Sequence, residues 1–287
     1  MNKLAVLISG SYRNFDSTWK INEAILNKLG IRYEVFFHTW DLNPNLDTNI
    51  LISEYKNRFY LTPFPKRYSV FPQNIYNEKI KQEYGFRSIE VSQFDEKGIA
   101  TMFNLGNFKT NNLYRSHVNS CAMYIGIDTV SRKIPKGSEF SHFLRIRTDY
   151  ILNEYTVDKV LKSDLVFFGQ LLPTDEGFIG DQCFGGDLDR GGFILETLST
   201  LNAITQSSEW DIQNPEILGE NVIRQKLKPY RQDLKISFFN GSGEILRPRV
   251  RFDLAAMRPN FIGIVIRHNV FVLIAKTQRF FNKFIKK

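Results

Sequence analysis

The sequence predicts an α/β protein in which a mostly parallel central sheet is flanked by helices. Two observations predict this class. LAVLIS (residues 4–9) and YEVFFHTW (residues 33–40) are apolar enough to be buried on both faces, and a helical segment separates them. Strands of this kind belong to parallel sheets covered by helices, and ligands bind beyond the carboxyl ends of such strands. We therefore expect a ligand site at that edge of the sheet.

The first strand, helix and second strand form one βαβ unit. Asp16 or Ser17 can cap a helix through WKINEAILNKL, and Gly30 ends it. Residues 41–110 are mixed in composition and rich in Asn, Pro and aromatic residues, so we expect short helices and loops there.

The remaining elements follow in order from residue 112. Apolar residues recur at helical spacing over residues 112–133, and FLRIRTDY (143–150) then reads as a strand. We expect after it a strand in LKSDLVFFGQLL, a loop in EGFIGDQCFGGDLDRGG (176–192), helices in FILETLSTLNAI and ENVIRQKL, and a hairpin in SFFNGSGEILRPRVRF that turns at Asn240 and Gly241.

Charge is distributed unevenly along the chain. The formal net charge is +8, and seven positive charges with no acidic residue follow Asp253, which leaves +1 for residues 1–253. A near-neutral body argues against a nucleic-acid-binding protein. Two cysteines and four scattered histidines give neither a disulfide framework nor a zinc spacing. The first apolar run is too short for a signal peptide, so we expect a cytoplasmic protein.

The strand FLRIRTDY carries charges where a buried strand is apolar. Side chains alternate along a strand, so Arg145, Arg147 and Asp149 share one face. Arginines at a crevice can hold phosphate oxygens, and an aspartate at the strand end can hold a divalent cation. The alternative is a buried ion pair that only fixes the order of the strands.

Two further candidate groups follow the first two strands. SGSYRNF (9–15) places Ser9 and Gly10 where a backbone can approach a ligand, and Arg13 can meet an anion there. FFHTWD (36–41) places His38 and Asp41 at the crevice edge, where they could bind a base or ribose. An ordinary turn and a core histidine are the respective alternatives.

Carboxylates later in the chain are candidates for acid–base chemistry. Asp181 in GDQC could be a general base, and Glu220 in NPEILGEN is the reserve. Asp187 and Asp189 in DLD could be a metal pair, although an aspartate just before a helix is more often its cap.

The order of these parts resembles a family of enzymes. AVLISGSYRNF, EVFFHTWD, YRSHVNSCAMY, FLRIRTDY, GDQCFGG and NPEILGENVIRQKL together resemble bacterial glycosyltransferases of surface-polysaccharide synthesis, close to the WavE-type lipopolysaccharide proteins. The resemblance covers about residues 1–230. It implies a single GT-A-like (Rossmann-like) domain over residues 1–253, and transfer of a sugar from a nucleotide-sugar donor to a lipid-linked or surface-glycan acceptor of capsule, lipopolysaccharide or O-antigen synthesis.

The resemblance also assigns roles to residues. It places the donor between Ser9, Gly10 and Arg13 and the charged strand, with RTD where relatives of this fold carry a metal-binding DxD. Asp149 would then bind Mg or Mn, but Arg147 replaces the first aspartate and leaves metal dependence open. A non-catalytic nucleotide-binding or membrane-docked scaffold of the same fold is the alternative.

The C-terminal segment, residues 254–287, has its own pattern. Drawn as a helix, residues 273–287 place apolar side chains on one side and five cations on the other. Such a basic amphipathic helix binds an anionic membrane surface, which predicts a peripheral protein on the inner face of the cytoplasmic membrane. A final helix packed on the body is the alternative.

Overall fold

The computed structural model describes residues 3–12, 15–41, 83–105, 114–137, 139–169, 182–207, 221–230, 233–240 and 244–245. The strands are β1 (Lys3–Ser9), β2 (Arg32–Trp40), β3 (Ser88–Ser92), β4 (Phe140–Arg147), β5 (Tyr150–Ile151), β6 (Leu165–Gly169), β7 (Cys183–Asp187), β8 (Ile236–Asn240) and β9 (Glu244–Ile245). The α-helices are α1 (Phe15–Lys28), α4 (Glu96–Met102), α5 (Tyr114–Ser131), α6 (Glu154–Val160), α7 (Leu188–Gly191), α8 (Thr197–Thr205) and α9 (Asn221–Leu227). The 3-10 helices are η3 (Gly192–Leu195) and η5 (Lys228–Tyr230).

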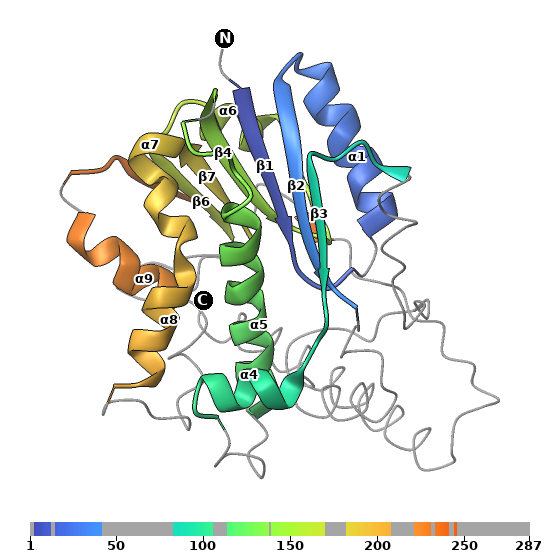
Figure 1. Ribbon diagram of the computed structural model, residues 1–287. Coiled ribbons are helices and arrows are strands. Elements are labelled where there is room, and N and C mark those ends of the chain that lie inside the picture. The colour runs from blue at the N-terminus through green and yellow to red at the C-terminus, as the bar shows by residue number, and fades with distance from the viewer. Residues whose placement is uncertain are drawn as a thin grey trace, which may run out of the picture. The chain divides into compact units, whose positions relative to one another are not determined.

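Seven strands form the central sheet in the order β3-β2-β1-β4-β7-β6-β8 (Figure 1). Within this sheet β7 runs antiparallel to both neighbours, while the other strands run parallel to one another. The predicted α/β class with a mostly parallel sheet flanked by helices is therefore confirmed. The carboxyl ends of β1, β2, β3 and β4 meet at one edge of the sheet, which we call the carboxyl edge.

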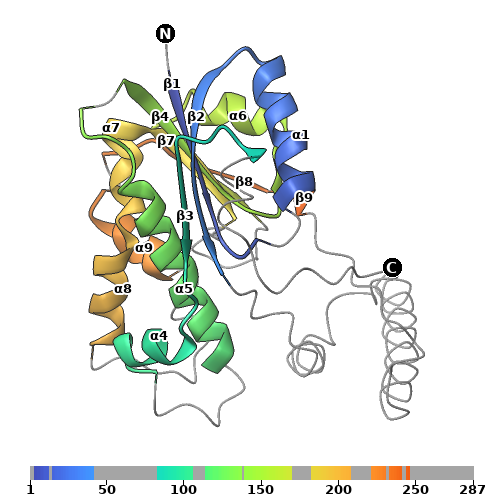
Figure 2. The ribbon, with the colours of Figure 1, turned by 45° about the vertical axis from the view of Figure 1, so that its right-hand side comes forward.

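Helices cover both faces of the sheet, as the turned view in Figure 2 shows. Alternate residues of the central strands enter two apolar cores, so that Leu7 and Phe143 lie in the core beside α5 and α8, and Val6 and Leu144 in the core beside α1 and α6. All four side chains are fully buried. Burial of one such side chain contributes about 1.5–3 kcal/mol, which explains why the sheet is the stable centre of the fold.

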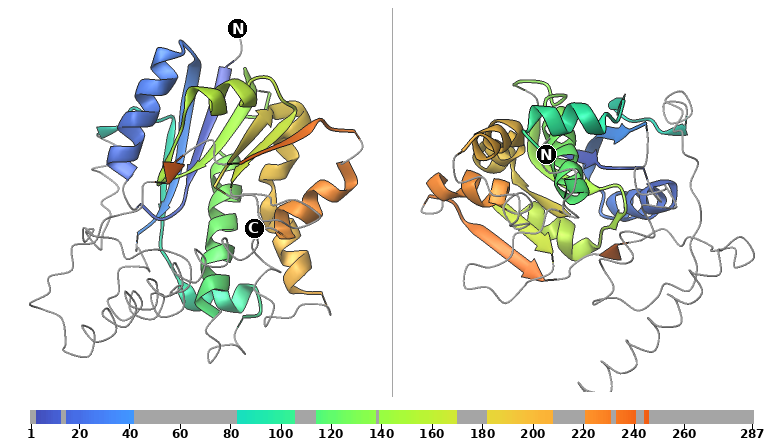
Figure 3. Two further views of the ribbon diagram at one scale, coloured as in Figure 1. Left: turned by 180° about the vertical axis from the view of Figure 1, so that it is seen from behind. Right: turned by 90° about the horizontal axis from the view of Figure 1, so that it is seen from below.

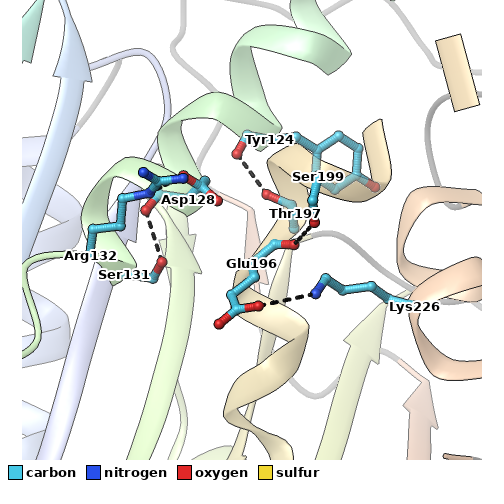
Figure 4. Close-up of polar contacts among 8 residues, drawn as sticks. All are labelled: Tyr124, Asp128, Ser131, Arg132, Glu196, Thr197, Ser199 and Lys226. Carbon is cyan, nitrogen blue, oxygen red and sulfur yellow. Dashed lines mark hydrogen bonds and ion pairs between the residues drawn. The ribbon is translucent and has the colours of Figure 1, made fainter. Parts of the chain in front are cut away.

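Polar contacts join the helices of one face (Figure 4). The hydroxyl of Thr197, at the start of α8, donates to the carbonyl oxygen of Tyr124 in α5 at 2.8 Å. Lys226 of α9 lies 3.8 Å from a carboxylate oxygen of Glu196. Burial lowers the pKa of Lys226, and the nearby carboxylates oppose that shift. These contacts fix α8 and α9 beside α5.

Several predicted elements are confirmed. The two strands of the first βαβ unit, the long helix now seen as α5, the charged strand β4 and the strand β6 lie where the sequence predicts them. The first helix begins at Phe15. Asp16 therefore lies inside its first turn and is not its cap.

Other predictions are wrong. Residues 183–191, predicted as loop, form β7 and α7. The helix predicted over residues 193–204 is present as α8, but it begins only at Thr197 and η3 precedes it. The predicted hairpin around Asn240 does not form, because β8 pairs in parallel with β6 and β9 pairs with β5 in a separate two-stranded sheet. Figure 3 shows β8 from behind, at the side of the sheet away from α1. Within residues 41–110, β3 was not expected.

Among the described residues, no helix is long and apolar enough to span a bilayer. The predicted basic amphipathic segment, residues 254–287, lies outside the described part of the chain.

Candidate functional site

The candidate site lies where β1 and β4 end side by side. These strands pair in parallel, and their last residues, Ser9 and Arg147, are partners in the register. Gly10 follows with φ +141°, a conformation that other residues rarely adopt. The backbone therefore turns at Gly10 in a way that the sequence motif SGS provides for.

A hydrogen bond connects the loop that follows β1 to the turn that follows β4. The hydroxyl of Thr148 donates to the carbonyl oxygen of Ser11. A Cβ atom at Gly10 would lie 3.5 Å from the Thr148 hydroxyl oxygen. The loop after β1 and the turn after β4 are thus one connected structure, and Thr148 is a contact that sequence reasoning missed.

Arg145 lies near the end of β4, next to Ser9, and is fully buried. Its Nε and Nη2 atoms lie 3.4 Å and 3.3 Å from the Ser9 hydroxyl oxygen. Its guanidinium also lies over the ring of Phe184 on β7, 5.6 Å from the ring centroid. A buried positive charge favours anions close by. Ser9 and Arg145, both predicted as donor-binding residues, are therefore brought together.

Arg147 and Asp149 form a bidentate ion pair at the surface end of β4. Arg147 Nε donates to Asp149 Oδ1 at 2.8 Å, and Arg147 Nη2 donates to Oδ2 at 2.7 Å. The Arg147 side chain is 20% exposed, whereas that of Asp149 is 0% exposed. Of the three predicted charges, Arg147 and Asp149 are in contact, and Asp149 lies in the turn after the strand rather than in the strand.

Asn22 of α1 holds the segment that follows Asp149. Its buried amide donates to the carbonyl oxygen of Tyr150 at 2.8 Å and accepts from the backbone N–H of Leu152 at 2.8 Å. Two hydrogen bonds from one buried side chain fix this backbone. No sequence pattern marks Asn22, because its partners lie far away along the chain.

Gln182 directly precedes β7 and borders the site. Its carbonyl oxygen accepts from the backbone N–H of Arg147 at 3.0 Å. The predicted bases Asp181 and Glu220 and the predicted anion-binding Arg13 lie outside the described residues. Their roles stay predictions.

His38 ends up in the core at the carboxyl end of β2. Its side chain is fully buried, its Nε2 lies 3.0 Å from the Ser92 hydroxyl, and its ring packs edge-on against Trp40 with 5.0 Å between centroids. Burial lowers the pKa of His38 to about 4. The imidazole is therefore neutral at pH 7 and supports the wall of the site, while its predicted contact with a nucleotide stays a prediction.

Asp41 connects two loops at the same edge. Its Oδ1 accepts from the backbone N–H of Phe94 at 2.7 Å, and its own N–H donates to the carbonyl oxygen of Ser92 at 2.9 Å. Asp41 is partly exposed. The structure thus shows a loop-positioning contact for Asp41 beside its predicted ligand role.

A tyrosine–aspartate cluster borders the loop after β1. The hydroxyl groups of Tyr12 and Tyr84 both donate to Oδ1 of Asp16. Burial, followed by the bond to Asp16, raises the pKa of both phenols. The two tyrosines therefore stay protonated donors. Tyr84 lies within residues 41–110, where no site residue was predicted.

In DLD, the structure shows the capping alternative for Asp187. β7 runs antiparallel, so Asp187 pairs with His142 at the opposite edge of the sheet. The carboxylate of Asp187 accepts from the backbone N–H of Arg190 at 2.9 Å and caps α7. Asp189 is exposed. The capping interpretation of Asp187 is therefore confirmed.

The residues present do not fit a divalent cation at Asp149. Both carboxylate oxygens are bound by Arg147, so a cation would have to displace this guanidinium group. Within the described ranges no cluster of three or more His, Cys, Asp or Glu side chains could hold a metal.

We compared the chain with known proteins. No protein-family model and no curated protein matches it. Similar solved structures include the inositol-1-phosphate CTP transferase from T. maritima, with a TM-score of 0.35, 9% identity, and coverage of 93% of this chain and 96% of that one. A glycosyltransferase involved in the glycosylation of the major capsid of PBCV-1 has a TM-score of 0.33, 10% identity, and coverage of 83% and 80%. Mouse xyloside xylosyltransferase 1 has a TM-score of 0.34, 10% identity, and coverage of 83% and 85%. We therefore base the function on the geometry of the site.

Proposed function

We propose that this protein is a glycosyltransferase that moves a sugar from a nucleotide-sugar donor to a hydroxyl group of a lipid-linked or surface-glycan acceptor. The observation that supports this most is the site at the ends of β1 and β4, where Arg145 and Arg147 converge beside the turn at Gly10. Guanidinium groups bind phosphate oxygens strongly, and the carboxyl edge of a parallel sheet is where nucleotides bind.

The proposed reaction uses these charges on the leaving group. The acceptor oxygen attacks the anomeric carbon, the bond from that carbon to the diphosphate breaks, and the acceptor proton passes to a carboxylate. The guanidinium groups stabilise the negative charge that develops on the diphosphate. Asp181 is the proposed base, since it directly precedes Gln182, whose carbonyl contacts Arg147. Glu220 is the alternative base.

The proposal extends to the biological setting. We place the residues 1–253 in a GT-A-like domain and expect an acceptor of capsule, lipopolysaccharide or O-antigen synthesis. The basic segment of residues 254–287 would hold the enzyme on the inner face of the cytoplasmic membrane, close to a lipid-linked acceptor.

A second candidate is a non-catalytic nucleotide-binding scaffold. The buried Arg147–Asp149 pair favours it, because such a pair can also serve only to fix the backbone after β4. Incubation with donor alone separates the two candidates, since a transferase slowly passes its sugar to water and a scaffold does not.

A thermal-shift panel tests the proposal. UDP, GDP, CDP, dTDP and CMP are each added to the full chain, and stabilisation by one of them would identify the donor class. The nucleotide that stabilises then defines the donors for an assay of sugar transfer or donor hydrolysis. No shift with any nucleotide would contradict both candidates.

Replacing Arg147 with Ala should remove transfer activity, because one charge-assisted contact to the leaving group is lost. The change also removes the ion pair of the buried Asp149 carboxylate, so circular dichroism of the variant must first show that it is folded. We expect at least a 100-fold loss of rate, which corresponds to about 3 kcal/mol. Arg87→Ala is the matched control, since Arg87 is 59% exposed and its guanidinium lies 3.7 Å from Glu34. Equal activity of the two variants would count against the proposed site.

A further inference from the structure

The Asp149 carboxylate is engaged on both oxygens by one arginine. The two hydrogen bonds, 2.8 Å and 2.7 Å long, form the parallel fork in which guanidinium and carboxylate fit best. Asp149 is fully buried, whereas one fifth of the Arg147 side chain is exposed. A ligand from solvent can therefore reach the Arg147 guanidinium, whereas the Asp149 carboxylate is buried.

A divalent cation at Asp149 would have to displace this arrangement. It would compete with the Arg147 guanidinium for the same oxygens and would lie next to a fixed positive charge. The buried guanidinium of Arg145 adds a second positive charge from the same strand. Arg145 and Arg147 lie on the same face of β4, and guanidinium groups bind phosphate oxygens rather than cations.

The backbone around the pair is fixed from two sides. Thr148, between the paired residues, is bonded to the loop after β1. Asn22 holds the backbone at Tyr150 and Leu152. The turn that carries Asp149 thus has little freedom to present its carboxylate to a metal, and it holds the arginine fork in one orientation.

We infer that Asp149 is a positioning residue that orients Arg147, and that this protein binds the diphosphate of a nucleotide through guanidinium groups without a divalent cation at Asp149. The inference rests on the proposed function for the identity of the ligand. It goes beyond that function by assigning the charge on the leaving group to arginine and by removing Asp149 from the metal ligands.

The first experiment uses the unaltered full chain. Its affinity for the nucleoside diphosphate selected by the thermal-shift panel is measured in EDTA and in manganese, and Mn²⁺ binding to the protein alone is followed by electron paramagnetic resonance. We expect equal nucleotide affinity in both buffers and no Mn²⁺ site that depends on Asp149. Loss of nucleotide binding in EDTA, or a Mn²⁺ site that Asp149→Asn removes, would overturn the inference.

The second experiment tests positioning. Asp149→Asn should weaken binding of the nucleoside diphosphate by roughly 10- to 100-fold, while binding of the corresponding nucleoside should not change. A merely structural defect would weaken both ligands equally and would overturn the positioning role. Arg147→Lys, which keeps the charge and loses the fork, should reproduce the selective loss. Asp189→Asn removes an exposed carboxylate at the opposite edge of the sheet and should change neither affinity.

The outcomes separate the two proposals. If no nucleotide binds in either buffer, the glycosyltransferase proposal fails. The Mn²⁺ titration then decides the role of Asp149 by itself, because a Mn²⁺ site lost in Asp149→Asn would still overturn the inference and no such site would support its metal-free part.

Discussion

His38 shows how burial changes the pKa of a side chain near the site. His38 is surrounded by Trp40, Ser92 and the backbone of Gly126, where a Cβ atom would lie 3.0 Å from its Nδ1. The charged groups that act on it are Glu90, which raises its pKa, and Lys133, which lowers it. Burial also lowers the pKa and is the largest effect, so it outweighs Glu90. The same residue type at an open edge would titrate near neutral pH, and this one does not.

His38 should make the protein sensitive to acid. The pKa of His38 is about 4 in the folded chain and about 6.5 when unfolded. The unfolded chain therefore binds an extra proton between these values, so stability is fully present above about pH 6.5 and falls as the pH drops toward 4, by up to about 3 kcal/mol. Urea unfolding at pH 7 and at pH 4.5 should show this loss in the wild type and a smaller loss in His38→Gln.

His142→Gln provides the control for that measurement. Burial also lowers the pKa of His142, but His142 lies at the amino end of β4, away from the site. Its replacement should remove a smaller part of the acid sensitivity. The same loss of stability in the wild type and in His38→Gln would contradict the prediction.

At the level of elements, β7 shows why sequence reasoning failed. Its sequence CFGGD is rich in Gly and Asp, a composition typical of loops. In the structure these glycines serve packing, since a Cβ atom at Gly185 would lie 2.4 Å from the carbonyl oxygen of Phe143. Buried apolar runs such as β1, β2 and β6 were predictable from composition alone. Composition alone could not predict a strand such as β7, whose glycines pack closely against its neighbours. It also could not predict β9, which pairs with a strand far away in the sequence.

Gly185→Ala should therefore destabilise the sheet strongly. The new methyl group would meet the backbone of β4, which cannot move aside without breaking strand pairing, so we expect a loss of about 3 kcal/mol in the free energy of unfolding. Gly85→Ala is the matched control, because nothing lies within 4 Å of a Cβ atom there. Chemical denaturation of the two variants checks this, and similar stabilities would be inconsistent with the packing of β7.

The site was predictable in part for the same physical reasons. Alternation along FLRIRTDY was enough to bring Arg145 and Arg147 to one place, and the order of the strands placed Ser9 beside them. The bidentate bond between Arg147 and Asp149 was one of two open alternatives. The contacts of Asn22 and Thr148 depend on tertiary structure, so no local pattern could indicate them.

At the level of the whole molecule, positive charge is concentrated in the C-terminal segment. Residues 1–253 have a net charge of +1, and seven positive charges follow. Positive charge concentrated in one segment favours anionic surfaces, and each cation near an anionic lipid surface contributes on the order of 1 kcal/mol. The proposed nucleotide binding and the proposed membrane binding should therefore be separable.

Deleting residues 270–287 should test that separation. The shortened protein should no longer sediment with liposomes that contain phosphatidylserine, and it should keep the nucleotide-induced thermal shift of the full chain. Binding of the full chain should also weaken as salt concentration rises, because surface electrostatics are screened. Undiminished sedimentation of the shortened protein would rule out this segment as the membrane anchor.

The small sheet of β5 and β9 has a mechanical consequence. β9 pairs Ile245 with Tyr150 and Glu244 with Ile151, and Tyr150 directly follows Asp149. Tension at Ile245 would be transmitted through these two backbone pairs to the peptide that follows Asp149. Asn22 anchors the same peptide from α1 and would resist that load. Tension at Ile245 would thus act on the turn that carries Asp149.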